Sequence, residues 1–295
     1  MSRVEVTNPD RVLFPAIGVT KGQVVDYYAR VADHLLPHVA GRPLVLERFP
    51  RGIDGQGFYQ KNLPDHAPEW LARVEIPTVE GGVTRYGVVD DADGLVWVAN
   101  QSAVVLHTLL AEAAAPQRPV EVIFDLDPAD DDLGPVQSTA RALRHLLVDL
   151  GLAPRVKSSG SQGLHLVVDV IDDDATYART EGFAHRVAEL VADRLEEVTT
   201  EHRKRNRRGR LFLDVLRNGP ASHAVAPYSL RARPEAPVAA PLTWDEALSP
   251  RFHPRRITIG NVFRRLAQIE DPWASISRPS TTIAEAAEAL DEAVR

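Results

Sequence analysis

The sequence predicts an α+β protein, and two kinds of pattern support this fold class. Short runs in which apolar residues alternate with others, such as residues 120–127 (VEVIFDLD) and 211–216 (LFLDVL), are typical of strands. Longer runs with apolar residues three and four apart, such as residues 24–39 and 177–197, are typical of helices. Both kinds recur along the 295 residues, which are enough for one large or two modest domains.

The composition is that of an ordinary soluble globular protein, with 44% hydrophobic and 25% charged residues. No apolar run approaches the length of a membrane span, and the N-terminus lacks the apolar core of a signal peptide, so we expect a cytoplasmic protein. The absence of cysteine excludes disulfides and cysteine metal sites. A net charge of −7 argues against a protein that coats nucleic acid through bulk electrostatics, although it leaves room for local basic surfaces.

The N-terminal part contains a helix start that favours an anion. Thr20 and Gln23 form a capping-box pattern ahead of residues 24–39, and Lys21 lies in the first turn of that helix. The free N–H groups and the dipole of a helix start attract anions, so Lys21 could grip a phosphate there. The alternative is an ordinary solvated lysine, and these residues alone do not decide between the two.

Residues 44–49 (LVLERF) and 58–61 (FYQK) predict a hairpin that carries aromatic and basic side chains together. Its residues of these two kinds are Arg48, Phe49, Phe58, Tyr59 and Lys61. Rings that stack on bases, interleaved with cations that meet phosphates, are what single-stranded or gapped DNA requires of a protein. An ordinary hairpin core has the same composition, so that alternative stays open.

The segments after the hairpin predict a further strand and a further helix. Residues 95–100 (LVWVAN) have a strand pattern, and residues 101–113 are expected to form a helix with Asn100 as its N-cap. His107 on that helix is expected to be packed or partly exposed.

Residues 114–119 (AAPQRP) are the clearest linker-like break in the chain. We therefore divide the chain into an N-terminal module, residues 1–115, and a second module, residues 116–295. We find no internal repeat.

The second module is organised around two acids. Residues two apart on a strand point to the same face, so Asp125 and Asp127 project together while their apolar neighbours enter the core. A third acid, Asp214, lies in the strand pattern of residues 211–216. If the two strands are neighbours, three carboxylates form a cup for two Mg²⁺ or Mn²⁺ ions, the arrangement that two-metal phosphoryl transfer needs. An Asp-x-Asp pair is by itself a weak signal, because Asp is also favoured in turns.

Three further segments carry residues suited to phosphate. Residues 158–163 (SSGSQG) form a Ser/Gly loop whose backbone N–H groups could make a nest for phosphate oxygens, and His165 follows beside it. Residues 203–210 (RKRNRRGR) are strongly basic and lead into the strand of Asp214. Such a run is usually a solvated loop, but at the mouth of a metal site it could contact a phosphate backbone. A later extended segment delivers Arg231.

In this order and spacing the motifs resemble one family. The chain is similar to the polymerase domain of bacterial LigD proteins, a branch of the archaeo-eukaryotic primase superfamily used in non-homologous end joining and related repair. The matching motifs extend over nearly the whole length: NPDRVLFP, TKGQVVDYYARVA, RPLVLERFPRG, FYQK, WVANQSAVVLH, VIFDLDP, SSGSQGLHL, FLDVLRN and APYSLRAR. The resemblance implies an archaeo-eukaryotic primase-like catalytic core, with an RRM-like, mostly antiparallel sheet and helices, plus an N-terminal α/β module.

The resemblance also implies roles for individual residues. The catalytic and metal-binding residues are Asp125, Asp127 and Asp214. The nucleotide-binding residues are Ser159, Gly160, His165 and Arg231. Three pairs of residues are DNA-binding candidates. Arg11 and Lys21 fall in a pocket for the 5′-phosphate at the downstream edge of a gap. Phe58 and Tyr59 lie against the template, with Arg48 and Lys61 beside them.

The implied activity is template-directed nucleotidyl transfer with Mn²⁺ or Mg²⁺, preferring ribonucleotides, at gaps or broken DNA ends. The expected partners are DNA with gaps, overhangs or 5′-phosphate ends, NTP or dNTP, and a Ku-type end-binding protein, with no membrane partner. No ligase or nuclease domain accompanies the motifs, so we expect a stand-alone polymerase with a separate ligase. The implied location is the cytoplasm, in association with the nucleoid.

Two departures from the family pattern keep other interpretations open. Gln162 stands where many relatives carry Lys, which removes one triphosphate contact, and His223 occupies a place that is often basic. They motivate a DNA-end-binding module with a degenerate active site as an alternative. De novo primer synthesis needs the same core and is another. Haloacid-dehalogenase-type phosphatases also carry FDLD, but near the N-terminus and before Gly-Thr, whereas here Pro128 follows at mid-chain.

Overall fold

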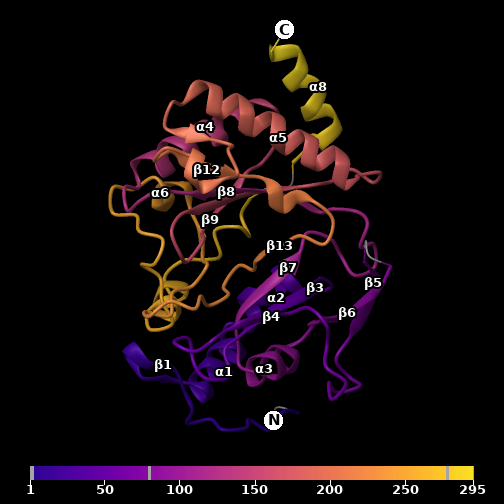
Figure 1. Cartoon of the computed structure of the whole chain (residues 1–295), viewed down its shortest axis with the longest axis vertical. Coiled ribbons are helices and arrows are strands. Elements are labelled where there is room, and N and C mark those ends of the chain that lie inside the picture. Colours follow the sequence, from indigo (N-terminus) through magenta and orange to yellow (C-terminus); the bar gives the residue numbers. More distant parts are fainter. Residues whose placement is uncertain (1–2, 79–80, 277–278, 295) are drawn as a thin grey trace. The chain divides into compact units, whose positions relative to one another are not determined.

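The computed structural model describes residues 3–78, 81–276 and 279–294. The chain divides into two compact units, each with its own sheet (Figure 1). The first unit contains Met1–Pro116, His223–Ala240 and Ile257–Gln268, and the second contains Gln117–Ser222, Pro241–Arg256 and Ile269–Arg295. The chain first changes unit within the linker-like break. Two later segments of the predicted second module belong to the first unit, because they pair and pack with its elements.

The first unit is built on a six-stranded sheet in the order β13-β7-β3-β6-β5, with β4 paired to β3, and every pair is antiparallel. Its strands are β3 (Pro43–Arg48), β4 (Phe58–Gln60), β5 (Arg73–Pro77), β6 (Val83–Val88), β7 (Ala103–Leu109) and β13 (His223–Val225). Its other elements are β1 (Val12–Phe14), β2 (Val19–Thr20), α1 (Lys21–Arg30), α2 (Ala32–Val39), α3 (Ala92–Asn100) and α7 (Val262–Leu266).

Helix α1 begins at the predicted capping box. The Thr20 hydroxyl accepts a hydrogen bond from the Gln23 N–H, and the Gln23 side chain accepts one from the Thr20 N–H. The structure divides the predicted single helix in two at Val31. There the His34 N–H bonds to the Val31 carbonyl, only three residues back, in a turn tighter than an α-turn.

The predicted strand at residues 95–100 and helix at residues 101–113 are wrong, because the structure exchanges the two. The first lies in helix α3, whose start is capped by the Asp91 carboxylate accepting a hydrogen bond from the Gly94 N–H. The second contains strand β7, in which every residue is buried. A run that is apolar on all sides has no period, so burial and β-branched residues decide its structure. His107 is packed, with 6% of its surface exposed.

The second unit is built on a sheet in the order β11-β12-β8-β10-β9-β14. Its strands are β8 (Glu121–Asp127), β9 (Arg155–Ser158), β10 (Leu164–Asp169), β11 (Val198–Thr199), β12 (Leu211–Asp214) and β14 (Pro241–Leu242). Its helices are α4 (Gly134–Asp149), α5 (Tyr177–Arg194), α6 (Trp244–Ala247) and α8 (Ile283–Val294). Strands β11 and β12 are parallel and the other pairs are antiparallel, which confirms the predicted mostly antiparallel sheet.

Helices α4 and α5 cover one face of strand β8 and leave the other face for polar groups. Both helices contact β8, and buried residues of α4 recur at helical spacing from Val136 to Leu147. Phe124 and Leu126 of β8 are fully buried. Because successive side chains of a strand alternate between faces, Asp125 and Asp127 lie on the opposite face.

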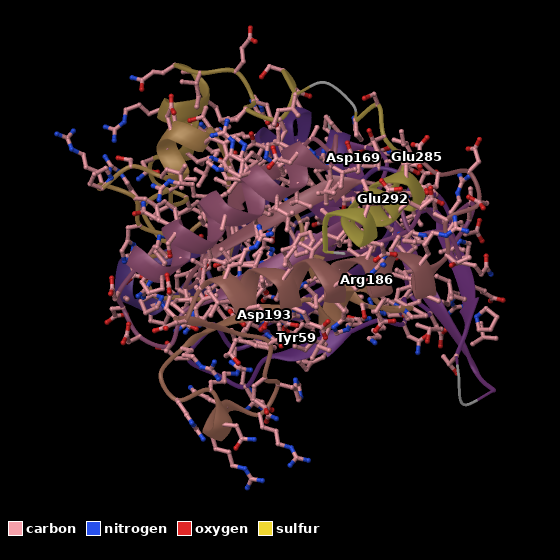
Figure 2. The ribbon with its side chains drawn as sticks, turned by 90° about the horizontal axis from the view of Figure 1, so that it is seen from above. Tyr59, Asp169, Arg186, Asp193, Glu285 and Glu292 are labelled. Carbon is pink, nitrogen blue, oxygen red and sulfur yellow. The ribbon has the colours of Figure 1, made fainter. Side chains whose placement is uncertain are left out.

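Helix α8 packs beside α5 in the second unit (Figures 1 and 2). The Asp172 carboxylate accepts hydrogen bonds from the N–H groups of Ile283 and Ala284 and thereby caps the start of α8. Arg186 of α5 forms an ion pair with Asp291 of α8. Among the residues that the structure describes, no helix is long and apolar enough to span a membrane.

Asn218 fixes the turn that follows β12. Its side-chain oxygen accepts a hydrogen bond from the Ile123 N–H, and its amide donates to the carbonyls of Ile123 and Val215, each at 2.8 Å. Asn218 is 1% exposed, so these bonds are made away from water. The side chain thus continues the pairing with β8 after β12 has ended at Asp214.

We predict that Asn218→Ala lowers the free energy of unfolding by about 3 kcal/mol, because the buried N–H and carbonyl of Ile123 lose their partner. Urea denaturation measures the change. Asn206→Ala, at an exposed position, is the control and is expected to stay within about 0.5 kcal/mol of the wild type. Equal stability of the Asn218 variant and the wild type would contradict the role of this side chain.

Candidate active site

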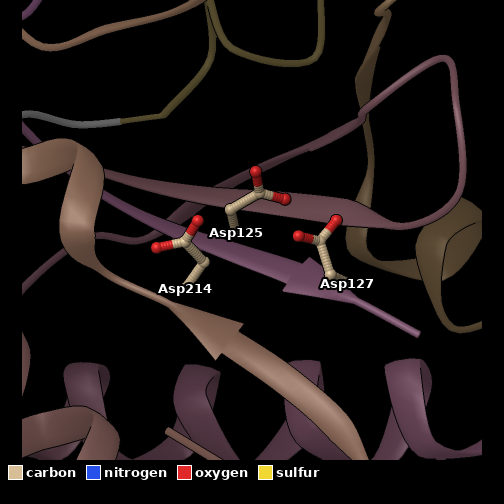
Figure 3. Close-up of side chains that lie close together, drawn as sticks. All are labelled: Asp125, Asp127 and Asp214. Carbon is tan, nitrogen blue, oxygen red and sulfur yellow. The ribbon is translucent and has the colours of Figure 1, made fainter. Parts of the chain in front are cut away.

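Three carboxylates meet where strands β8 and β12 lie side by side (Figure 3). Asp214 of β12 lies directly opposite Asp125 of β8, and Asp127 is two residues further along β8. One carboxylate oxygen from each acid lies within 4.8 Å of the other two. The structure therefore confirms that the two strands are neighbours, and it forms the expected cup of three acids.

The acids begin a row of polar residues that crosses the sheet. Asp125 lies opposite His165 of β10, and His165 lies opposite Lys157 of β9. Directly opposed residues of antiparallel strands share a face, so Asp214, Asp125, His165 and Lys157 follow one another along one line. His165 Nε2 lies 3.2 Å from Asp125 Oδ1, and Lys157 is 1% exposed. Asp125 thus has basic groups on one side and acids on the other.

These surroundings give the three acids different pKa values. Burial alone would raise the pKa of Asp125, but basic neighbours, His165 first among them, outweigh it and lower the pKa to about 2. Burial and the charges of Asp125 and Asp214 raise the pKa of Asp127 to about 7. Burial also raises the pKa of Asp214. The hydrogen bond that the Leu216 N–H donates to its carboxylate opposes this rise. Buried acids that repel one another in this way are stabilised by a divalent cation.

Ser159 organises the loop between β9 and β10. Its hydroxyl oxygen accepts hydrogen bonds from the N–H groups of Ser161, Gln162 and Gly163 at 3.1–3.2 Å. These three N–H groups, which were expected to face phosphate oxygens, are therefore bonded to the Ser159 oxygen, and the hydroxyl hydrogen is directed away from them. Gly160 permits the turn with a φ of +64°. The loop thereby holds the Ser159 hydroxyl at a fixed position.

Gly163 joins this loop to the strand of the acids. A Cβ at residue 163 would lie 1.8 Å from the Leu126 carbonyl oxygen, so only glycine lets the two segments approach this closely. Leu126 is the residue between Asp125 and Asp127. The Ser/Gly loop is thereby held directly against the acidic strand.

In the first unit, three cations gather at the start of α1. Lys21 is 3% exposed, and its Nζ donates hydrogen bonds to the Thr7 carbonyl at 2.6 Å and the Thr7 hydroxyl at 2.9 Å. Burial, followed by the charges of Arg11 and Arg48, lowers the pKa of Lys21. Arg11 donates to the Pro50 carbonyl, which holds it nearby. Like charges held together at a helix start favour a bound anion.

Two aromatic residues of the predicted hairpin, Phe58 and Tyr59, lie on its surface, whereas Phe49 is buried in the core. Strand β4 pairs with β3, with Arg48 opposite Phe58, which confirms the hairpin. Phe58 and Tyr59 are 45% and 57% exposed, and the Arg48 guanidinium lies 5.4 Å from the centre of the Phe58 ring. Lys61 is also exposed. Two exposed rings beside cations are not the core of an ordinary hairpin.

Arg231 and His223 also belong to the first unit. Burial raises the pKa of Glu47, and Arg231, Arg233 and His223 oppose that rise, so these cations face the same carboxylate. His223 packs against Tyr59, with ring centres 5.7 Å apart. The predicted site residues thus form one group around the acids of the second unit and other groups in the first.

A model of the LigD primase-polymerase domain matches residues 20–273 of this sequence. The chain belongs to the LigD primase-polymerase family. It is 38% identical over 283 residues to LigD of Mycobacterium tuberculosis (strain ATCC 25618 / H37Rv) and 32% identical over 279 residues to the bifunctional LigD of Bacillus subtilis (strain 168). These alignments cover 91% and 94% of this chain but only 36% and 44% of the relatives.

The fold agrees with this membership. The solved polymerase domain of M. tuberculosis ligase D, in complex with DNA, superposes with a TM-score of 0.86 at 36% identity. The alignment covers 94% of this chain and all of that domain. The resemblance that the motifs indicated and the predicted α+β primase-polymerase fold are both confirmed.

Sequence reasoning predicted His165 but assigned no site role to Lys157, Gly163 or Arg217. Lys157 and His165 lie equally far from Ser161, so the hairpin turn brings them opposite each other, a symmetry visible in the sequence. Gly163 was part of a recognised loop, but its contact with β8 is tertiary. Arg217 follows Asp214 by three residues, and its Nε lies 3.5 Å from Asp125 Oδ2.

The departure at Gln162 affects a side chain and not the loop itself. Gln162 is exposed, and its backbone N–H makes the hydrogen bond to Ser159 that holds the LigD-type loop together. Any residue other than proline supplies that N–H. The loop geometry is therefore independent of the departure.

We predict that Asp127→Asn stabilises the metal-free protein in a pH-dependent way. The pKa of Asp127 in the folded chain is about 7, above that of an unfolded aspartate at about 4, so its ionisation opposes folding increasingly between these values. Asparagine avoids this cost, so the variant is expected to be about 1–2 kcal/mol more stable near pH 8 in a chelator and equal near pH 4.

Chemical denaturation at the two pH values measures this difference. Asp131→Asn removes an exposed acid from the following turn and is the matched control. A stabilisation by Asp127→Asn that is the same at both pH values would contradict the raised pKa.

Proposed function

We propose that the chain is a template-directed polymerase, a metal-dependent nucleotidyltransferase that extends DNA at gaps or broken ends, as in non-homologous end joining. The observation that carries this proposal is the cup of three carboxylates beside the Ser/Gly loop in a member of the LigD primase-polymerase family. The relatives are named for non-homologous end joining, and the similar M. tuberculosis domain was solved with DNA.

Asp125, Asp127 and Asp214 are the residues that would hold divalent cations. They fit such ions, because carboxylate oxygens are the donors that Mg²⁺ and Mn²⁺ prefer and the raised pKa values of Asp127 and Asp214 reflect charge that lacks compensation. When bound, two ions would lower the pKa of a primer 3′-hydroxyl and neutralise charge on the leaving pyrophosphate. From the family resemblance we expect Mn²⁺ and ribonucleotides to be preferred.

The phosphates of the incoming nucleotide are expected to bind beside the acids. From the resemblance we expect Ser159 to contact these phosphates, and Gly160, without a side chain, allows phosphate oxygens to approach the backbone closely. His165, next to Asp125 in the row, is placed to meet the same phosphates. We assign Arg231 as a further nucleotide contact on the resemblance alone; in the structure its charge acts on the Glu47 carboxylate.

The first unit is expected to bind DNA through its cations and rings. Lys21 and Arg11 would take a downstream 5′-phosphate, since both contribute charge at the start of α1. Phe58 and Tyr59 would stack on exposed bases, with Arg48 and Lys61 contacting the backbone. Each contact adds one charge-assisted or stacking interaction without reading base sequence.

The basic run at residues 203–210 is an additional candidate for backbone contact. Arg207 fixes this loop by donating to the carbonyls of Glu201 and His202 and by lying 3.7 Å from the centre of the Phe212 ring. The exposed cations that remain are Arg203, Lys204, Arg205 and Arg208. Nitrogen-tipped side chains point outward from this segment (Figure 2).

Two kinds of partner follow from this function. A Ku-type end-binding protein would bring DNA ends to the polymerase, and a ligase would seal the filled gap. Both belong to the proposal, because the matched relatives are longer multifunctional or bifunctional proteins of which this chain covers less than half.

We predict that the protein extends a primer by one nucleotide across a gapped duplex in the presence of Mn²⁺, and that Asp127→Ala reduces this extension by about a thousandfold while sparing DNA binding. The assay compares ribonucleotides with deoxynucleotides, and a primed with an unprimed template to test de novo priming. Binding of gapped DNA without extension would favour the degenerate end-binding module. Equal extension by Asp127→Ala would exclude the metal assignment.

We also predict that Lys21→Gln removes the preference for a 5′-phosphate at the downstream edge of the gap. Loss of one charged contact is expected to weaken binding of phosphorylated gaps about tenfold, with little effect on 5′-hydroxyl gaps. Arg30→Gln removes the same charge from the other end of α1 and is the matched control. An undiminished phosphate preference in Lys21→Gln would place the pocket elsewhere.

A further inference from the structure

Arg217 stands on a fixed backbone beside the three acids. The Leu216 N–H donates to Asp214 Oδ1 at 2.8 Å, and the Asn218 side chain binds β8, so the residues on both sides of Arg217 are anchored. The Cα of Arg217 therefore cannot move far from the cup, and any movement of the guanidinium must come from its own side chain.

The guanidinium itself is held loosely. Its Nε lies 3.5 Å from Asp125 Oδ2, longer than an ordinary N–H to O hydrogen bond, and the side chain is 44% exposed. Arg207 in the preceding loop differs, because it donates to two backbone carbonyls at 3.1 and 2.9 Å. Arg217 is thus attracted to the cup by charge and is not fixed there by hydrogen bonds.

The charge of Arg217 acts on the whole cup. Burial is the largest influence on the pKa of each of the three acids, and the guanidinium lowers the pKa of all three. A single positive charge therefore partly neutralises the group that a divalent cation would neutralise. A guanidinium and a divalent cation that both lie against these acids would repel each other, so binding of one weakens binding of the other.

We propose that Arg217 is a displaceable counter-ion, which neutralises the acidic cup when no divalent ion is bound and turns outward to the phosphates of the nucleotide when one is. This inference rests on the proposed function, because it needs the cup to bind a metal ion. The half-exposed side chain has room to turn, and guanidinium groups bind phosphate oxygens well.

This arrangement couples the binding of metal and nucleotide. A metal ion that binds alone must displace the guanidinium into water, whereas the nucleotide phosphates offer it a new partner. The nucleotide therefore strengthens metal binding, and by linkage the metal strengthens nucleotide binding. Removing the guanidinium removes both the competition and part of the coupling.

The test is Mn²⁺ binding followed by electron paramagnetic resonance, with and without a non-hydrolysable ribonucleoside triphosphate. Arg217→Gln is expected to bind Mn²⁺ alone about five- to tenfold more tightly than the wild type, the size expected for like unit charges about 4 Å apart that water screens almost fully. The strengthening of Mn²⁺ binding by the nucleotide should shrink by a similar factor. Arg217→Lys keeps the charge and should stay close to the wild type.

Arg141→Gln removes the same charge from an exposed position on α4 and is the matched control, with unchanged Mn²⁺ affinity expected. Equal Mn²⁺ affinity in Arg217→Gln and the wild type would overturn the proposal, provided that Asp127→Ala still loses Mn²⁺ binding, and the polymerase assignment would then stand. Mn²⁺ binding that Asp127→Ala does not weaken would overturn the metal site itself, and the counter-ion role with it.

Discussion

Repulsion among three carboxylates is the constraint on which the structure of the second unit depends. Pairing of β12 with β8 sets Asp214 opposite Asp125, and strand alternation adds Asp127 on the same face. The unit compensates for part of this charge with His165 and Lys157, which follow Asp125 across the sheet. The pKa values of Asp127 and Asp214 are nevertheless raised, first by burial and then by the neighbouring acids. Retained electrostatic strain of this kind is typical of functional sites.

The first unit also holds like charges close together, but here the charges are positive. Lys21 is nearly buried, and the charges of Arg11 and Arg48 add to the effect of burial in lowering its pKa. Cations that are held together and partly desolvated bind an anion more strongly than scattered surface lysines do, because the cost of desolvation has already been met by folding. One unit therefore favours a bound cation and the other favours a bound anion.

Features of the fold and the site were predictable where they depend on residues close together in the sequence, and were missed where they depend on residues far apart. The two-residue period placed Asp125 and Asp127 on one face, and the capping box located the start of α1, because both signals are local. Strand β7 was mistaken for a helix because its fully buried run has no period. The approach of Lys157 and Arg217 to Asp125 depends on strand register and on the turn anchored by Asn218. The pairing of Lys157 with His165 follows from their equal distance from Ser161, but no local pattern encodes the approach of Arg217.

The contact between Gly163 and the Leu126 carbonyl oxygen ties the Ser/Gly loop to the acidic strand. The Ser/Gly loop cannot shift without shifting the strand that carries the acids, so phosphate and metal ligands keep one relative position. That position is set by backbone atoms and by the Ser159 hydroxyl, to which the N–H of Gln162 donates. The identity of the side chain at residue 162 therefore does not set this geometry, which uses only the backbone N–H of that residue. Glycine at residue 163 is thus required by the packing of the loop against β8, and the loop and the acids share one rigid support.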